Sequence, residues 1–308
     1  MHKYIIKRLL MLIPVILGVT LLVFTLAHFA PGDPVRIMLG DGASAEAVAE
    51  LTEELGLNDP FFVQYFNFIF NAIRGDFGMS FQTRRGVGEE IFARYPNTMR
   101  LAGQGVLVAL FIGIPLGILS AVRQYTIFDY IGSFLGLVWV SIPNFWLGLM
   151  MIMIFAVNLR WLPATGSTEW VHWIMPTFAI ATGSAASIMR MTRSSMLESI
   201  RNDYIRTARA KGQKESIVIF RHALRNALTP VATTAGLSFG ILLGGAVLTE
   251  TIFAIPGLGS YMVSSMINRD WPVVRGGAVL IAVSFTVVNM LVDVLYAFLD
   301  PRIRSQYK

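Results

Sequence analysis

The chain has 308 residues, of which 55% are hydrophobic and 14% charged, with a formal net charge of +6. This composition is too apolar for a typical soluble domain, in which about 25% of residues are charged. The sequence holds no cysteine, which excludes disulfides, thiol catalysis and cysteine-based metal sites. Its four histidines are scattered without a metal-ligand spacing, so we expect no metal site.

Six stretches of the sequence are long enough and sufficiently free of charge to cross a bilayer, which takes about 20 residues. A charge at mid-bilayer costs roughly 2.5–3.5 kcal/mol on insertion scales, so uncharged runs of this length are informative. We therefore predict an all-α membrane protein with six transmembrane helices. They cover residues 9–30, 101–122, 130–159, 170–189, 226–249 and 276–299, the last interrupted by Asp293.

The first run follows a basic amino terminus and could be taken for a secretory signal peptide. It is longer than the 7–15 residues typical of a signal-peptide apolar region, and no A-x-A cleavage pattern follows it. We interpret it as an uncleaved signal-anchor helix.

Lysine and arginine gather in the segments that an inside amino terminus would leave in the cytoplasm. Nine of them lie between residues 190 and 225, whereas the short outer loops hold Arg160, Arg269 and Arg275. Because cytoplasmic loops carry an excess of these residues, we predict that both termini are cytoplasmic. The net charge thus reflects membrane orientation, and we expect no nucleic-acid partner.

Residues 31–98 separate the first two spans and carry ten acidic residues and five arginines. The sequence PGDP ends the first helix, because proline and glycine do not continue it. SAEAVAELTEELGL then predicts an amphipathic helix capped by Gly56, and a second helix follows with Pro60 at its first position and Gly75 as its cap. We predict a small helical extracytoplasmic insertion rather than a disordered loop.

Several spans carry small residues at four-residue spacing, which lets helix backbones approach closely. We interpret these rows as helix packing rather than as the lining of a substrate pathway. Pro115, Pro143 and Pro176 lie within predicted spans and predict kinks. The glycine rows are Gly113 and Gly117, Gly132 and Gly136, and Gly236, Gly240 and Gly244.

A polar stretch, which we name the basic segment (residues 193–229), joins the fourth and fifth predicted spans. SMLE, from Ser195, fits a capping box and predicts the start of a helix there. Met196, Ile200, Tyr204 and Ala208 follow four apart and predict its apolar face.

A second short helix is predicted after Gly212, which has the identity of a C-cap. Ile217, Phe220 and Leu224 would share its apolar side. Two such helices cannot form a core of their own. A basic helix of this kind can lie on anionic lipid or dock into the groove of a partner protein, and the pattern alone leaves both open.

YIRTARAKG followed by HALRNALTPV resembles the cytoplasmic coupling loop of ATP-binding-cassette importer permeases, in its dipeptide and oligopeptide version. Arg206, Thr207 and Ala208 stand at the E-A-A positions of the superfamily motif E-A-A-x-x-x-G, and Gly212 stands at its glycine. The residues HALR at 222–225 occupy the I-x-L-P positions. The missing Glu and Pro match the R-T-A-R-A-K-G form of the peptide-permease subfamily.

Further stretches in the same order resemble this family along most of the chain. They are HFAPGDPV, LGLNDPFFVQY, GDFGMSF, RMTRSSMLE, ETIFAIPGLG, RDWPVV and DPRIR. The resemblance implies a type I importer permease with three parts. These are the cytoplasmic amino terminus and first span (1–30), the insertion (31–98), and a five-helix core (99–308) that contains the basic segment.

The resemblance also implies the partners. The expected ones are a second homologous permease subunit in a heterodimer, one or two ATPase subunits, an extracytoplasmic substrate-binding protein and membrane lipid. Since the sequence lacks G-x-x-x-x-G-K followed by Ser or Thr, we expect no enzyme activity and no cofactor here, with ATP and Mg²⁺ on the ATPases. The expected location is the bacterial or archaeal cytoplasmic (inner) membrane. Peptides are the expected cargo, with glutathione, nickel chelates or opine-like compounds as alternatives.

The coupling residues implied by the resemblance gather around Gly212. There the arginines and Lys211 could pair with partner carboxylates, and Ala208 and Ala210 would allow close approach. The full set is Tyr204, Arg206, Thr207, Ala208, Arg209, Ala210, Lys211, Gly212, Ile217, Phe220, Arg221 and His222.

Candidate pathway residues are polar residues within spans, namely Ser141, Asn144, Thr182 and Ser238. Glu250 and Asp293 are the acids closest to lipid depth. Intramembrane carboxylates can mark ion pathways, but each lies near a predicted interface, so we favour a structural role.

Two other classes of function stay open at this point. A proton-coupled secondary transporter would act without an ATPase and usually carries inverted repeats, of which none is clear here. A membrane enzyme has no support, because no Ser/His or metal arrangement converges in the sequence. The ten acids of residues 31–98 could dock a binding protein or could simply keep the insertion soluble.

Overall fold

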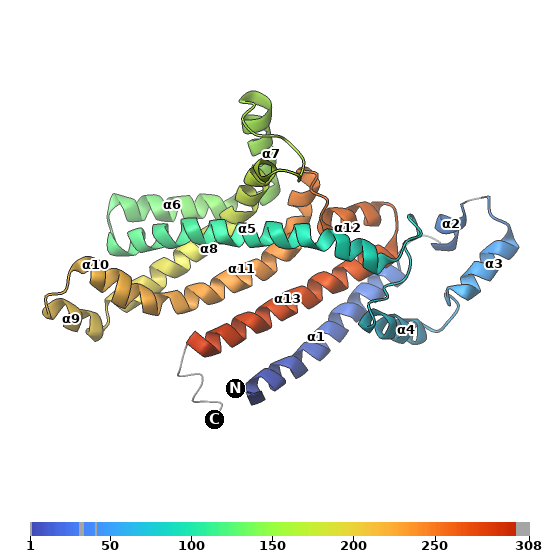
Figure 1. The fold of residues 1–308 in the computed structure, drawn as a ribbon, viewed down its shortest axis with the longest axis horizontal. Helices are drawn as coiled ribbons and strands as arrows, with labels where there is room; N and C mark the ends of the chain where they lie inside the picture. Colours follow the sequence, from blue (N-terminus) through green and yellow to red (C-terminus); the bar gives the residue numbers. More distant parts are fainter. Residues whose placement is uncertain (1, 31–33, 41, 300–308) are drawn as a thin grey trace. The chain divides into compact units, whose positions relative to one another are not determined.

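The computed structural model describes residues 2–30, 34–40 and 42–299. Helices dominate this part of the chain, whose one extended pairing is an isolated bridge between Met79 and Gly86 (Figure 1). The all-α prediction is confirmed. The chain forms two compact units, one from residues 9–98 and 256–284 and the other from the described residues of 1–8, 99–255 and 285–308.

Three helices contribute to both units: α1 (His2–His28), α5 (Val87–Val122) and α13 (Trp271–Leu299). The first unit adds the short helices α2 (Pro34–Leu39), α3 (Ala45–Glu54), α4 (Phe61–Ile73) and α12 (Leu258–Ile267). The second adds α6 (Ile127–Ser141), α7 (Asn144–Met151), α8 (Ile174–Ile200), α9 (Asp203–Ala210), α10 (Glu215–Ile217) and α11 (Leu224–Ile252). It also contains π-helical turns at Ile152–Asn158 and Val218–Ala223 and a 3₁₀ turn at Trp170–Trp173.

The predicted count of six spans is not confirmed. Among the described residues, four helices are long and apolar enough to cross a membrane, namely Leu10–His28, Val87–Val122, Glu215–Ile252 and Trp271–Val292. A fifth span is present if α6 and Asn144–Asn158, which are bent by 97° at their junction, count as one.

The fourth predicted span became α8, which is long but rich in Ala, Gly, Ser and Thr. More than half of its residues are buried, because α5, α6, α7 and α11 pack around it. A helix enclosed by protein does not need the apolar exterior that lipid demands, which explains its modest hydropathy.

The three prolines behave differently. The kink predicted at Pro143 is confirmed, since Pro143 is the N-cap residue of α7 at the 97° bend. Pro176 lies in the first turn of α8, where proline is tolerated, so it starts a helix rather than kinking one. Pro115 lies inside α5, which runs without a break.

Glycines make close approach to α8 possible, as the packing interpretation predicts. A Cβ on Gly113 would lie 2.7 Å from the carbonyl oxygen of Ala185. One on Gly117 would lie 2.5 Å from Cβ of Thr192. Only part of the glycine row on α11 serves helix packing. Gly236 and Gly240 face α13, whereas Gly244 has open space around it.

The insertion after the first span is helical, as predicted. Ser44 caps α3 by accepting a hydrogen bond from the amide of Ala47 at 3.2 Å. Gly56 and Gly75 follow α3 and α4 with φ of +62° and +84°, the left-handed conformation expected of residues that end a helix. Pro60 is the N-cap residue of α4 rather than its first helical residue.

Aromatic contacts attach α4 to α1 within the same unit. Phe24, which is 2% exposed, packs edge-on against the rings of Phe61 and Tyr65. The hydroxyl of Tyr65 donates to the carbonyl oxygen of Leu17 at 3.0 Å. A cluster of buried residues completes this core: Phe77, Val87, Ile91, Leu258, Val273 and Val279.

The close approach at α8 gives a first prediction. Gly117→Ala should lower the free energy of unfolding by about 1–3 kcal/mol, because the new methyl group would overlap Thr192 and the carbonyl oxygen of Met189. Thermal unfolding of the detergent-purified chain measures the change. Gly244→Ala is the matched control and should leave the midpoint unchanged or raised, and equal loss in both variants would contradict the packing argument.

Candidate functional site

The first residues of the basic segment belong to α8, and no helix starts at Ser195. The helix continues to Ile200, and Ser195 donates its hydroxyl to the sulfur of Met191 at 3.7 Å. The predicted capping box is therefore wrong, because an unbroken helix already satisfies the backbone amides that a cap would bind. The first new helix is α9, and Gly212 follows its C-cap residue with φ of +72°, as predicted.

An apolar cluster fixes the basic segment to the ends of α5, α8 and α11. We name it the anchoring cluster. Its buried members are Ala121, Met196, Ile205, Ala208, Val218, Ile219, Ala223 and Ala227. Each fully buried aliphatic side chain contributes roughly 1.5–3 kcal/mol relative to an exposed one. The segment is thus packed against the bundle rather than left as a free loop.

The predicted apolar faces are only partly correct. Met196, Ile200 and Ala208 pack in or against the anchoring cluster, but Tyr204 is 41% exposed. In the second helix Phe220 is 61% exposed, and Val218 is buried instead.

The reason is the π-helical turn Val218–Ala223. Its hydrogen bonds join residues five apart, so the residues that share a face differ from those of an α-helix. Val218, Ile219 and Ala223 are buried as a result, and Ile217 is left 40% exposed.

A bidentate ion pair crosses the turn at Gly212. Arg209 donates to the two carboxylate oxygens of Glu215 at 3.1 and 2.6 Å. These hydrogen bonds raise the pKa of Arg209 above its usual value, so the guanidinium stays charged. Both side chains are about half exposed, and such a pair contributes at most about 1 kcal/mol.

Two further pairs of polar side chains join the basic segment to itself and to α11. His222 Nε2 lies 2.7 Å from Oε1 of Gln213. Asn226 donates from Nδ2 to the hydroxyl of Tyr204 at 3.0 Å and to the carbonyl oxygen of His222 at 3.2 Å. Gln213, Glu215 and Asn226 were not among the residues singled out from the sequence, although Glu215 is the one acidic residue between 204 and 249.

The predicted coupling residues divide into a buried and an exposed group. Ala208 is 7% exposed and belongs to the anchoring cluster, and His222 is half-buried. The exposed group is Tyr204, Arg206, Thr207, Arg209, Ala210, Lys211, Gly212, Ile217, Phe220 and Arg221. It presents apolar and cationic side chains together on one short stretch.

The candidate pathway residues are not joined by a hydrogen bond in the part of the chain that is described. Thr182 and Ser238 are buried, and Thr182 donates to the carbonyl oxygen of Ala179. Ser141 is exposed and donates to the carbonyl oxygen of Leu137. Asn144 is half-buried at the start of α7.

Of the two acids near lipid depth, the structure describes the side chain of one. Glu250 is completely buried near the end of α11. The side chain of Asp293 lies outside the described residues. Sequence reasoning missed a third carboxylate, Asp129, which pairs with Arg193 at 2.7 Å and joins α6 to α8. No group of three or more His, Asp or Glu residues is placed to hold a metal ion among the residues described.

Comparison with known proteins identifies the family. Residues 113–305 match the family described as binding-protein-dependent transport system inner membrane component, and residues 1–102 match its amino-terminal region. The chain belongs to this family. It is therefore a multi-pass component of a transport system in the inner membrane and not an enzyme.

Relatives match along their whole length. A dipeptide transport system permease protein, DppB, from Alkalihalophilus pseudofirmus is 43% identical over 99% of this chain and 100% of its own. An oligopeptide permease, AppB, from Bacillus subtilis is 46% identical over 98% and 99%. A glutathione permease, GsiC, from Salmonella choleraesuis is 42% identical over 99% of both chains.

Solved structures support the fold. The MetNI methionine ABC transporter in inward-facing conformations matches with a TM-score of 0.59 and 21% identity, over 68% of this chain and 96% of that one. An amino acid ABC transporter matches with a TM-score of 0.51 and 12% identity, over 70% and 94%. The prediction of an importer-permease fold is confirmed.

The anchoring cluster gives a second prediction. Ile205→Ala should loosen the basic segment, because removing a buried aliphatic side chain costs about 2–5 kcal/mol. The rate of tryptic cleavage between residues 206 and 214 should rise at least tenfold, measured by mass spectrometry on the purified chain. Ser216→Ala, an exposed change in the same segment, should cleave like the parent. Equal rates for the parent and Ile205→Ala would show that the cluster does not hold the segment.

Proposed function

We propose that this chain is the permease subunit of an ATP-driven peptide importer and forms half of its translocation pathway. The observation that carries the proposal is the full-length match to permeases named for dipeptides, oligopeptides and glutathione. Peptides are the cargo class that these names share, since glutathione is itself a small peptide.

We further propose that the basic segment is the coupling loop that docks into an ATPase subunit. The exposed Tyr204, Ile217 and Phe220 would fill a groove on the ATPase, and Arg206 and Lys211 would meet its acidic side chains. Arg209 already has a carboxylate partner in Glu215, so its first role is to shape the turn. Exposed aromatic residues beside cations are typical of helix-in-groove recognition.

The anchoring cluster would transmit movement of the ATPases to the spans. When the ATPases close, they would carry α9 and the π-helical turn with them. Since these pack on the ends of α5, α8 and α11, the displacement would reach three long helices at once. ATP binding would open the pathway to the outside, and hydrolysis would return it to the state that is open to the cytoplasm. Together these steps form an alternating-access cycle.

The remaining parts of the proposal concern assembly. A second homologous permease would complete the pathway as a heterodimer, with one or two kinds of ATPase chain holding ATP and Mg²⁺ and no cofactor on this chain. An extracytoplasmic binding protein would deliver peptides, and lipid would surround the spans. Both termini would face the cytoplasm of a bacterium or an archaeon.

Co-purification tests this assembly. The tagged chain, extracted from its native membrane in mild detergent, should bring down a second permease and at least one ATPase with a phosphate-binding loop. Peptide uptake into vesicles holding the complex should require ATP. A chain that purifies alone and moves solute down a proton gradient without ATP would instead be a secondary transporter.

Gly212→Val tests the coupling loop itself. A β-branched residue at φ of +72° is strained, so the turn should rearrange and ATPase retention should fall at least tenfold with normal membrane insertion. Gly40→Val is the matched control, because Gly40 has φ of +84° with open space around it in the insertion. This control should retain the ATPase. If Gly212→Val retained the ATPase fully, the basic segment would not be the coupling loop.

A further inference from the structure

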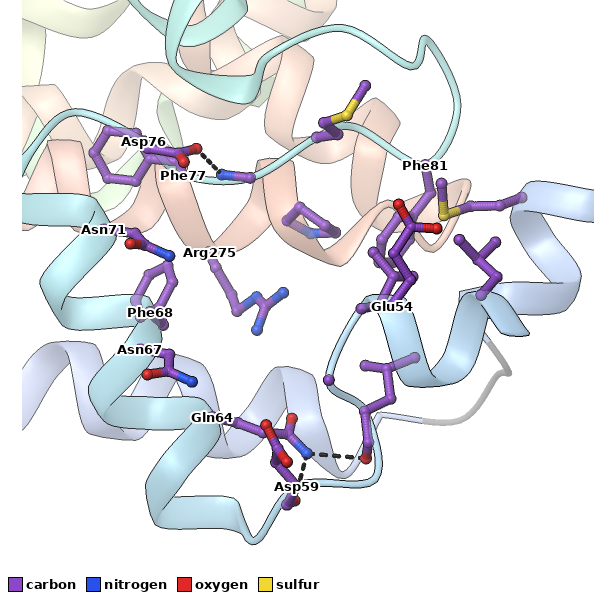
Figure 2. Close-up of a pocket in the computed structure, with 18 of the residues that line it drawn as sticks. Glu54, Asp59, Gln64, Asn67, Phe68, Asn71, Asp76, Phe77, Phe81 and Arg275 are labelled. Carbon is purple, nitrogen blue, oxygen red and sulfur yellow. Dashed lines mark hydrogen bonds between the residues drawn. The ribbon is translucent and has the colours of Figure 1, made fainter. Parts of the chain in front are cut away.

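The unit built from residues 9–98 and 256–284 contains a cavity of about 550 Å³ (Figure 2). It lies between α3, α4, the end of α1 and the start of α13. This volume falls within the roughly 300–1,000 Å³ of small-molecule sites. None of its lining residues belongs to the basic segment or to the candidate pathway residues, so the transport proposal gives it no role.

Arg275, which has no carboxylate partner among the described residues, extends into this cavity. Figure 2 shows Arg275 extending from α13 into the open space, with Phe68, Asn67 and Asn71 on α4 beside it. Its Nε is buried and has no hydrogen-bond partner among the residues described. Arg275 is partly buried, and a cation withdrawn from water without a partner is costly, so this arrangement favours an anionic ligand.

Aromatic rings hold the guanidinium in place. Its carbon lies 5.3 Å from the centre of the Phe24 ring and 5.5 Å from that of Phe68. Both distances are within the cation–π range and favour the charged guanidinium at this position. Its Nε–H has no partner among the described residues, and two N–H groups of a guanidinium match the two oxygens of a carboxylate.

Three acidic side chains also line this cavity. We name Glu54, Asp59 and Asp76 the acidic rim, and all three are exposed whereas Phe24 and Phe77 are buried. The rim is built by well-defined turns. Gln64 donates from Nε2 to the carbonyl oxygens of Leu57 and Asp59, at 3.0 and 2.9 Å.

Asp76 has one of its two carboxylate oxygens hydrogen-bonded among the described residues, which leaves the other for a ligand. Its Oδ1 accepts a hydrogen bond from the amide of Gly78 at 2.9 Å, which orients the group at the cavity. The lining thus combines a deep cation with anions nearer to solvent. A plain anion would meet repulsion from the rim, and a plain cation would meet repulsion from Arg275.

We propose that this cavity binds a small zwitterion of the amino-acid or short-peptide class. Its carboxylate pairs with Arg275, and its ammonium group faces the acidic rim. Asn67 and Asn71 supply amide groups for the intervening peptide bond. The site serves recognition within this unit and does not depend on ATP or on the coupling loop.

The first test uses trialanine and the full chain in an uncharged, lipid-free detergent, with binding followed by calorimetry. Trialanine should bind, and trialanine amide, which lacks the carboxylate, should bind at least tenfold more weakly. Equal binding of the two peptides, or of neither, would overturn the proposal. Because no ATPase or binding protein is present, failure of the importer assignment would not affect this result.

Variants of Arg275 then test whether this residue binds the carboxylate of trialanine. Arg275→Gln should lose at least tenfold in affinity for trialanine. Arg275→Lys keeps the charge without the two-pronged geometry and should lie between Gln and the parent. Arg74→Gln is the matched control, because Arg74 also lies over a phenylalanine ring, at 4.1 Å from that of Phe70, but does not line the cavity. Parent-like binding by Arg275→Gln would overturn the proposal even if trialanine binds elsewhere.

A lipid is the competing occupant, since phosphatidylethanolamine also carries both charges. In one outcome, lipid co-purifies with the parent chain but not with Arg275→Gln, and delipidated protein does not bind trialanine. This outcome would assign the cavity to a lipid headgroup. That result would overturn the proposal. Trialanine that displaces such lipid in proportion to its binding would support it.

Discussion

Close packing around α8 is the constraint on which the membrane core depends. Small residues along α8, together with Gly113 and Gly117 on α5, bring backbones so near that a single methyl group would not fit. Lipid offers no hydrophobic drive for helices to associate, so such contacts have to supply the stability. The same helix continues past the core to Ile200 and carries the basic segment at its end.

This continuity decides how the basic segment can act. A flexible loop would absorb a partner's movement, whereas a segment packed on three helix ends passes it on. Ile205, Val218 and Ala223 are almost fully buried, which leaves the segment little freedom of its own. The exposed residues are consequently presented on a rigid base. Polar contacts such as that between His222 and Gln213 orient the turn of the basic segment but contribute little to its stability.

The sequence predicted the features that depend on local chemistry. Uncharged runs gave most of the apolar spans, and Gly56, Gly75 and Gly212 ended helices because each can adopt positive φ. Features decided by tertiary packing were not predictable. Glu198 looked like part of a cap until α8 ran through it, and the π-helical turn moved Phe220 from the expected buried face to the surface. The cavity at Arg275 depends on residues more than 200 positions apart.

For the arginines, the distance to the nearest carboxylate says more about a binding site than the residue type does. Arg193 and Arg209 both lie in the stretch that looked functional for its positive charge, and each has a carboxylate within 2.7 Å. Their charges are largely satisfied inside the chain. In the sequence Arg275 counted only as one of the few positive charges of the outer loops, and its buried Nε has no partner among the residues described. A buried donor of a cation without a partner is the rarer arrangement, because folding rarely retains its cost without a compensating ligand or function. Arg275, rather than an arginine of the basic segment, is therefore the strongest indication of a binding site in the fold.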